Sequence, residues 1–402
     1  MKSVCAENIV RKFGRTTEEI FSLKEFRKKL ESGKKLNIKF GADVTAPLLH
    51  IGHGVNLWMM RGLQELGHKV QFLIGDFTTR IGDPTGKDQT RKIISTEEIE
   101  QNAGEFIGQV SNILITENPD VFEVRRNSEW FDSANCGKLL SLFSDVTYQR
   151  LISRDMFRKR IENGKEIRMH EMIYPILQGW DSVELKSDLT IVGSDQLFNE
   201  MMGRFFQEKY GQDPQVIITT KITPGLDGKQ KQSKSLNNFV AITDPPRQKF
   251  GKVMSLPDRL IAAWFRVYTE VQEGKIGEIE KDLARGINPM EKKLMLAAEI
   301  TSRYHGRETA AEEREWFVST FSKKEFPDTA EERFLPKGQY TIIEFLSKLL
   351  PERSNSELRR LITQGAVWIN GNRESDDKSR VTALDRMEIR VGRKIFLRVT
   401  GI

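Results

Sequence analysis

Two histidines and two lysines stand in patterns that fit nucleotide chemistry. His50 and His53 flank Gly52 in the sequence HIGH, and Lys231 and Lys234 alternate with polar residues in the sequence KQSKS. Imidazole rings at the start of a helix can pack against a nucleotide while backbone N–H groups face its phosphates, and a side chain in place of Gly52 would block that approach. Lysines on a glycine-flanked loop can neutralise a departing pyrophosphate. Taken alone, HIGH could be explained by histidines with a structural role, and KQSKS by a solvated lysine surface. The occurrence of both motifs in this order favours an ATP site.

The elements around HIGH are expected to form a βαβ unit. Alternating apolar residues at 36–40 predict a strand, helical spacing at 55–66 predicts a helix that ends near Gly67, and the apolar run at 70–74 predicts a second strand. Parallel strands of this kind bind ligands at their carboxyl ends. We therefore expect an α/β class of fold, with a Rossmann-like, doubly wound parallel sheet in a domain at residues 1–240. A largely helical insertion at about 94–186 is expected to interrupt it.

The remaining chain predicts two further domains. Residues 241–321 have helical periodicity, which favours an all-helical domain with an apolar core. The charged stretch 322–338 contains two prolines and predicts a linker. Residues 339–402 predict a small α+β module, in which Ser354 opens a helix and a hairpin turns at Gly392.

Composition narrows the class of protein. The chain has 402 residues, of which 38% are hydrophobic and 30% charged, as expected for a multidomain globular protein. We find no apolar run of about 18 residues and no secretory leader, so we expect a cytoplasmic protein without a membrane partner. Its two cysteines cannot form a disulfide framework or a zinc site by themselves. Most of the net charge of +6 lies in 341–402, which hints at a polyanionic partner but fits a solvated surface equally well.

These motifs resemble those of the class I aminoacyl-tRNA synthetases, in which HIGH and KMSKS motifs bind ATP. The stretch YPILQGWDSVELKSDLTIVGSDQLFN at 174–199 is similar to the signature of the tyrosyl-tRNA synthetase family, and GDFTTRIGDPTGKDQTR at 75–91 is similar to another segment of that family. With a C-terminal module that resembles the S4 RNA-binding fold, the resemblance is to the bacterial type and covers nearly the whole chain. It implies that L-tyrosine, ATP and tRNA(Tyr) are the substrates of a tyrosine–tRNA ligase.

The resemblance implies roles for individual residues. The ammonium group of tyrosine would be held by Asp83, Tyr174 and Gln178. Asp181 would accept a hydrogen bond from the phenol, and Gln196 would lie near the carboxyl group. The ATP site would be formed by His50, Gly52, His53, Gly193, Asp195, Lys231, Ser233 and Lys234, with Asp195 on the ribose. Lys87 and Arg91 would embrace pyrophosphate. Mg²⁺ on the ATP phosphates is implied, without a protein-bound metal or organic cofactor. The family also implies a homodimer, with the contact expected around 130–170.

Several positions depart from the family pattern. Lys39 stands where one branch of the family has a tyrosine that contacts the substrate phenol, and this chain is closer to a branch with lysine. Gln232 replaces the methionine of KMSKS, Val192 replaces a glycine, and Trp180 stands where tyrosine is common. Thr79 and Arg80 replace a glycine-containing pair. Arg80 is either a solvated surface residue or the sign of a modified substrate preference.

Two other classes of function compete with this interpretation. Nucleotidylyltransferases also place an HxGH motif at a strand-to-helix turn, but they lack the lysine loop and the terminal RNA module. A synthetase-like paralogue that holds RNA, or one that activates a tyrosine-like amino acid for another pathway, is the second alternative. The intact motif residues argue against lost catalysis, whereas Arg80, Val192 and Gln232 leave a changed substrate open.

Overall fold

The computed structural model describes residues 2–45, 48–81, 95–233, 236–322, 326, 330–392 and 395–402, with the side chains of 2–5 and 322 outside that description. The chain divides into two compact units, Met1–Ala310 and Ala311–Ile402. No helix in the described part of the chain has the length and apolar character needed to cross a bilayer.

A six-stranded sheet organises the first unit. Its strands are β1 (Thr17–Phe21), β2 (Asn37–Ala42), β3 (Lys69–Ile74), β4 (Phe122–Arg126), β5 (Leu189–Gly193) and β6 (Val216–Thr220). Their order is β1-β6-β5-β2-β3-β4, and every pairing except β1 with β6 is parallel. The predicted Rossmann-like parallel sheet is therefore confirmed. Strand β4 lies within the stretch predicted as a helical insertion. The prediction missed it because the sequence FEVRR is short and charged and lacks the apolar alternation of a strand.

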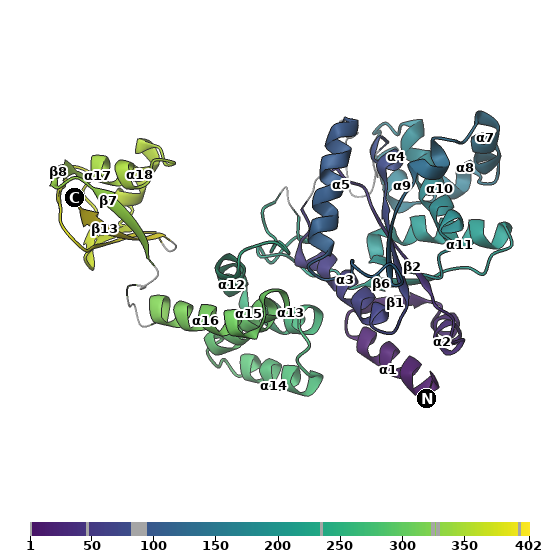
Figure 1. The fold of residues 1–402 in the computed structure, drawn as a ribbon, viewed down its shortest axis with the longest axis horizontal. Coiled ribbons are helices and arrows are strands. Elements are labelled where there is room, and N and C mark those ends of the chain that lie inside the picture. Colours follow the sequence, from purple (N-terminus) through teal and green to yellow (C-terminus); the bar gives the residue numbers. More distant parts are fainter. Residues whose placement is uncertain are drawn as a thin grey trace. The chain divides into compact units, whose positions relative to one another are not determined.

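Helices cover both faces of this sheet. They are α1 (Lys2–Gly14), α2 (Leu23–Glu31), α3 (Ile51–Gln64), α4 (Asp76–Thr79), α5 (Thr96–Val110), α6 (Ser128–Phe131), α7 (Cys136–Ser144), α8 (Tyr148–Ile152), α9 (Asp155–Glu162), α10 (Met169–Glu184) and α11 (Leu197–Lys209). A 3₁₀ turn, η1 (Ser194–Gln196), joins β5 to α11. Figure 1 shows α3 and α5 on one side of the sheet, and α10 and α11 on the other. This arrangement places the ends of β2 and β5 beside the helices that follow them.

The helices after the sheet are α12 (Pro246–Met254), η2 (Asp258–Leu260), α13 (Ile261–Tyr268), α14 (Glu273–Ala284), α15 (Met290–His305) and α16 (Arg307–Phe317), followed by a short π-helical turn, η3 (Val318–Ser322). Their core includes Trp264, Phe265 and Ile300, each with no exposed surface. The apolar stripe of this region therefore forms a packed interior, as its periodicity predicts.

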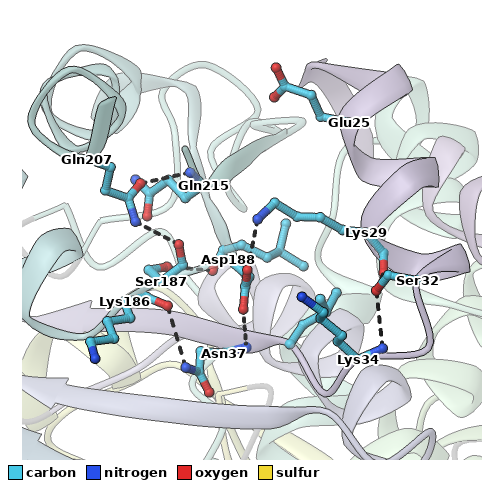
Figure 2. A network of polar contacts seen from close by, with 12 residues as sticks. Glu25, Lys29, Ser32, Lys34, Asn37, Lys186, Ser187, Asp188, Gln207 and Gln215 are labelled. Atoms are coloured by element: carbon cyan, nitrogen blue, oxygen red, sulfur yellow. Dashed lines mark hydrogen bonds and ion pairs between the residues drawn. The ribbon is translucent and has the colours of Figure 1, made fainter. Parts of the chain in front are cut away.

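A partly buried polar network holds the amino-terminal ends of the strands together. Asp188 immediately precedes β5, and its carboxylate pairs with the Lys29 ammonium at 2.8 Å and accepts the Asn37 backbone N–H at 3.0 Å. Gln207 of α11 donates to the Ser187 carbonyl at 2.8 Å and accepts the backbone N–H of Gln215 at 2.7 Å. Figure 2 shows these side chains converging on the starts of the strands. The network thus ties β2, β5, β6, α2 and α11 at the end of the sheet opposite the expected binding crevice.

The second unit is a small α+β module. Its elements are β7 (Glu331–Leu335), β8 (Gly338–Thr341), α17 (Ile342–Leu349), α18 (Asn355–Thr363), β9 (Val367–Ile369), β10 (Asn372–Glu374), β11 (Arg380–Ala383), β12 (Met387–Val391) and β13 (Ile395–Gly401). One sheet has the order β10-β9-β12-β13-β7, and β11 pairs with β8. Strand β7 falls inside the range 322–338 predicted as a linker. It pairs in parallel with β13, and its mostly exposed residues hide this pairing from the sequence.

The contact between α10 and α11 depends on a glycine. A Cβ atom built on Gly179 would lie 2.9 Å from the backbone carbon and Cβ of Met202, and 3.1 Å from the Phe206 ring. Distances below 3 Å to backbone cannot be tolerated, so these helices pack without a side chain between them at this point.

Gly179→Ala is therefore expected to lower the free energy of unfolding of the first unit by about 1–3 kcal/mol, because α10 and α11 must separate. The matched control is Gly277→Ala in α14, where a Cβ meets no atom within 4 Å and alanine should be neutral or stabilise by up to about 1 kcal/mol. Chemical denaturation of both variants measures the difference. Equal stabilities for the two variants would contradict the packing argument.

Candidate active site

The two histidines build the start of α3. His50 is the N-cap residue, and its Nδ1 accepts the Gly52 backbone N–H at 3.2 Å, while its own N–H donates to Nδ1 of His53 at 3.2 Å. The ring centroids are 3.9 Å apart. Because both Nδ1 atoms accept hydrogen bonds, each neutral ring carries its proton on Nε2. A Cβ on Gly52 would lie 2.8 Å from Nδ1 of His50, so the capping ring itself requires glycine there.

One extended segment connects the histidine turn to the lysine motif. The Ile51 N–H donates to the Val240 carbonyl at 2.9 Å, and His50 forms an antiparallel bridge with Ala241. A few residues earlier, Oδ1 of Asn238 accepts the Ser233 N–H at 2.8 Å. The structure thus brings together His50, His53 and Ser233, which are far apart in the sequence.

Lys231 meets the turn that follows β5. Its ammonium lies 2.8 Å from the Asp195 carboxylate, with both side chains partly exposed. Asp195 belongs to η1, and Gly193 is the last residue of β5. Such an exposed pair contributes at most about 1 kcal/mol, so it can be exchanged for other contacts at little cost.

Asp181 is a buried carboxylate in the last turn of α10. Its side chain accepts the Trp130 indole N–H at 3.0 Å and lies 3.5 Å from the Asn127 amide. Burial raises the pKa of Asp181 to about 8, although Lys39 and the two hydrogen bonds favour the charged form. The carboxyl group is therefore able to donate as well as accept a hydrogen bond near neutral pH.

Beside Asp181, a second buried carboxylate is neutralised by a lysine. Lys39 of β2 and Glu200 of α11 are each 2% exposed, and their charged groups lie 2.8 Å apart. Lys39 also donates to the Ser182 hydroxyl at 2.8 Å. Glu200 accepts further hydrogen bonds from Gln178 at 2.9 Å and from Gln215 at 2.8 Å.

Two more predicted residues join this network. The Gln178 amide donates to Gln196 at 3.3 Å, and Asn199 donates to Gln178 at 2.7 Å and to Gln196 at 3.1 Å. Because Gln196 directly follows Asp195, the amide network and the Lys231 contact are neighbours. The amino-acid and nucleotide residues predicted from sequence thus meet at η1.

Tyr174 lies on the same helix. Its hydroxyl donates to Asp43 at 2.9 Å, and the other oxygen of that carboxylate accepts the Thr78 hydroxyl at 2.9 Å. Tyr174, Gln178 and Asp181 are spaced four and three residues apart, which places them on one face of α10.

Four predicted site residues lie outside the described residues, namely Asp83, Lys87, Arg91 and Lys234. Conversely, sequence analysis missed residues that the structure places in these networks: Asp43, Thr78, Asn127, Trp130, Asn199, Glu200 and Gln215. Asn199 and Glu200 stand three and four positions after Gln196, and that helical spacing was the available signal.

The departures from the family pattern have local explanations. Arg80 pairs with Asp132 at 3.1 Å on the surface, with both side chains about half exposed. Trp180 packs in the core that includes Phe206 and donates to Glu184 at 2.8 Å. Gln232 is buried and bonded to Tyr268 at 2.8 Å. The structure gives no specific reason for Val192.

Within the described ranges, no cluster of three or more His, Cys, Asp and Glu side chains has the arrangement of a metal site. The Asp195 carboxylate is paired with Lys231. Mg²⁺ carried on ATP phosphates would need few protein ligands, and the residues present fit that mode of binding.

Comparisons with known families match both units. A family model described as tRNA synthetases class I (W and Y) matches residues 31–322, and an S4 domain model matches residues 342–386. A tyrosine–tRNA ligase of Aquifex aeolicus is 42% identical over 96% of both chains. One of Thermotoga maritima is 40% identical over 98% of both.

Solved structures agree at the level of the fold. A C-terminally truncated mitochondrial tyrosyl-tRNA synthetase of Coccidioides posadasii has a TM-score of 0.62 at 20% identity, covering 78% of this chain and 94% of that chain. A tyrosyl-tRNA synthetase of Archaeoglobus fulgidus complexed with L-tyrosine has a TM-score of 0.58 at 21% identity, covering 77% and 99%.

The pKa of Asp181 predicts a pH-dependent stability. The unfolded carboxyl ionises near pH ~4 and the folded one near pH 8, so the folded state binds more protons between these values. The stability contributed by Asp181 is thus full below about pH 4 and is lost as the pH rises to 8.

Asp181→Asn removes this titration. The difference in free energy of unfolding between the unaltered chain and the variant should therefore become smaller as the pH rises from about 5 to about 8.5. Urea denaturation without substrates measures it at both values. Asp120→Asn makes the same change at an exposed carboxylate and serves as the control. A constant difference for Asp181→Asn would contradict the raised pKa.

Proposed function

We propose residue roles from one premise: the chain belongs to the class I tRNA synthetases of the tryptophan and tyrosine group and, within it, to the tyrosine–tRNA ligases. An enzyme of this family activates L-tyrosine with ATP to tyrosyl-adenylate, releases pyrophosphate and transfers tyrosine to the 3′ end of tRNA(Tyr). The buried carboxylate of Asp181, on the helix face that carries Tyr174 and Gln178, is the observation that supports the residue roles most strongly.

The tyrosine side chain is proposed to end at Asp181. With a pKa near 8, this group can exchange hydrogen bonds with a phenol in either protonation state. Lys39 balances the charge of Glu200 beside it, so it acts on the pocket through electrostatics and through Ser182. Asp83, Tyr174 and Gln178 are assigned to the ammonium group, and Gln196 to the carboxyl group.

ATP is proposed to lie between the α3 turn and the lysine motif. His50 and His53 present N–H donors on Nε2, and Gly52 and Gly193 allow the backbone to come close. Asp195 would bind the ribose and release Lys231 to the phosphates, with Ser233 and Lys234 in the same loop. Lys87 and Arg91 would contact pyrophosphate. Mg²⁺ bound with ATP would neutralise part of the phosphate charge.

Activation needs no general base. The substrate carboxylate, with a reference pKa of roughly 3.5, is already ionised when it attacks the α-phosphorus. The bond to pyrophosphate breaks as the new one forms, so the protein must align two anions and stabilise the departing charge. Alignment can contribute roughly 7–11 kcal/mol, and a well-placed donor roughly 3–4 kcal/mol.

The C-terminal unit is proposed to bind tRNA(Tyr), in keeping with its S4 domain and the basic excess of 341–402. A homodimer through residues 130–170 is proposed as well. Leu140, Tyr148 and Ile161 of that region are 65%, 57% and 49% exposed, and a partner copy would cover such apolar side chains.

ATP–pyrophosphate exchange tests the amino-acid assignment. The purified chain with Mg²⁺ should exchange label with tyrosine alone among the standard amino acids, and should then charge tRNA(Tyr). Tyrosine is expected because the pocket supplies a buried partner for a phenolic hydroxyl. Exchange with another amino acid, or none with tyrosine, would contradict the proposal.

Asp181→Ala should reduce the preference for tyrosine over phenylalanine, measured as the ratio of kcat/KM in exchange, by about 10- to 100-fold, because one buried hydrogen bond to the phenol is lost. This ratio does not depend on the fraction of enzyme that is folded, so a loss of stability in the variant does not change it. Asp120→Ala serves as the surface control. An unchanged ratio in Asp181→Ala would remove this residue from the specificity site.

A further inference from the structure

We propose that Gln232 is a positioning residue that locks the described part of the lysine loop, residues 225–233 and 236–238, to the histidine turn and to α13. The inference rests on the proposed function, in which Lys231 and Lys234 of this loop bind the ATP phosphates. It concerns how the loop is held, which the two motifs by themselves leave open.

The amide of Gln232 makes two buried hydrogen bonds in opposite directions. Nε2 donates to the Tyr268 hydroxyl at 2.8 Å, and Oε1 accepts the Val240 backbone N–H at 3.2 Å. Gln232 and Tyr268 are 6% and 4% exposed. The Tyr268 hydroxyl also lies 2.6 Å from the Thr223 hydroxyl, so one chain of hydrogen bonds runs from Thr223 to Val240.

This chain continues directly into the start of α3. The Val240 carbonyl accepts the Ile51 N–H, the first backbone donor of the helix that His50 caps. A Cβ built on Gly52 would come within 3.8 Å of Nε2 of Gln232, which is ordinary contact distance. A single side chain therefore bonds to α13 and to Val240, and the Val240 carbonyl carries the link to the HIGH turn.

The hydrogen bonds of Gln232 affect the orientation of the neighbouring Lys231 side chain. Lys231 points outward to Asp195 at 2.8 Å, while Gln232 points inward, as successive residues of an extended segment do. The next N–H, of Ser233, donates to Asn238. Holding Gln232 inward thus fixes the direction in which Lys231 leaves the loop.

The chemistry of glutamine explains why the methionine of the family pattern would act differently here. A thioether donates no hydrogen bond and accepts only weakly. Methionine at this position would leave the Val240 N–H without the Gln232 oxygen, and Tyr268 with Thr223 alone. Its flexible side chain would fill the space without fixing a direction.

Gln232→Met should lower kcat/KM for ATP in tyrosine-dependent exchange about tenfold, the effect of one buried hydrogen bond. KM for ATP should carry most of this loss while KM for tyrosine stays within about twofold, because the hydrogen bonds of Gln232 run to Tyr268 and Val240. A general loss of folded enzyme would instead leave both KM values unchanged. Gln230→Met makes the same change at an exposed side chain of the same loop and should leave both constants unchanged.

Tyr268→Phe probes the other end of the link. It should reproduce the loss in kcat/KM for ATP, and the double variant with Gln232→Met should lose little more than either single variant, because both remove one interaction. Losses that multiply in the double variant, or an unaltered kcat/KM for ATP in Gln232→Met, would overturn the proposal.

Tryptic cleavage after Lys229 and Lys231 gives a readout that does not depend on catalysis. Loosening of the loop should accelerate it about tenfold in Gln232→Met and not in Gln230→Met. If Gln232→Met is cleaved faster but the unaltered enzyme shows no ATP–pyrophosphate exchange with tyrosine, the anchoring role of Gln232 is supported and the proposed function is refuted. Equal cleavage rates in an active enzyme would refute the anchor alone.

Discussion

The buried pair of Lys39 and Glu200 sets the electrostatics around which the candidate site is organised. Removing both charges from water is costly and is compensated only when the remaining polar groups are satisfied. Ser182, Gln178 and Gln215 supply those hydrogen bonds. With Asp181 nearby, two carboxylates face one ammonium, and burial shifts Asp181 toward its protonated form. A charge balance that spans β2, α10 and α11 therefore surrounds the carboxyl group proposed to meet the substrate phenol.

Much of the fold could be predicted from local patterns. The alternation and helical spacing in 36–77 correspond to β2, α3 and β3, and Gly67, with φ of +88°, follows the helix as predicted. The Ser354 cap and the β12–β13 hairpin were also predicted from the sequence. Strands β4 and β7 were not, because short charged strands at sheet edges bury too few side chains to leave an alternation in the sequence.

Only the residues that belong to recognisable motifs could be predicted for the site. HIGH and the lysine motif indicated the residue types, yet the bridge between His50 and Ala241 joins residues about 190 positions apart, and no periodicity reveals such a pairing. Asp43, Asn127 and Glu200 were missed for the same reason, since each acts through a partner on another element. At Gly52 the His50 ring gives a second reason for glycine, which the sequence did not reveal, beside the close approach of a nucleotide that the motif predicted.

Gly179 has a consequence for how readily this protein could acquire a new amino-acid substrate. At that point there is no room for even a Cβ atom between α10 and the Met202 backbone of α11, and the two helices carry Gln178, Asp181, Asn199 and Glu200. No compressible side chain remains between them to absorb a change in spacing. A larger substrate would have to be accommodated by exchanging the residues that face it. Divergence in this family would thus proceed through substitutions on a nearly rigid frame, with little contribution from helix repositioning.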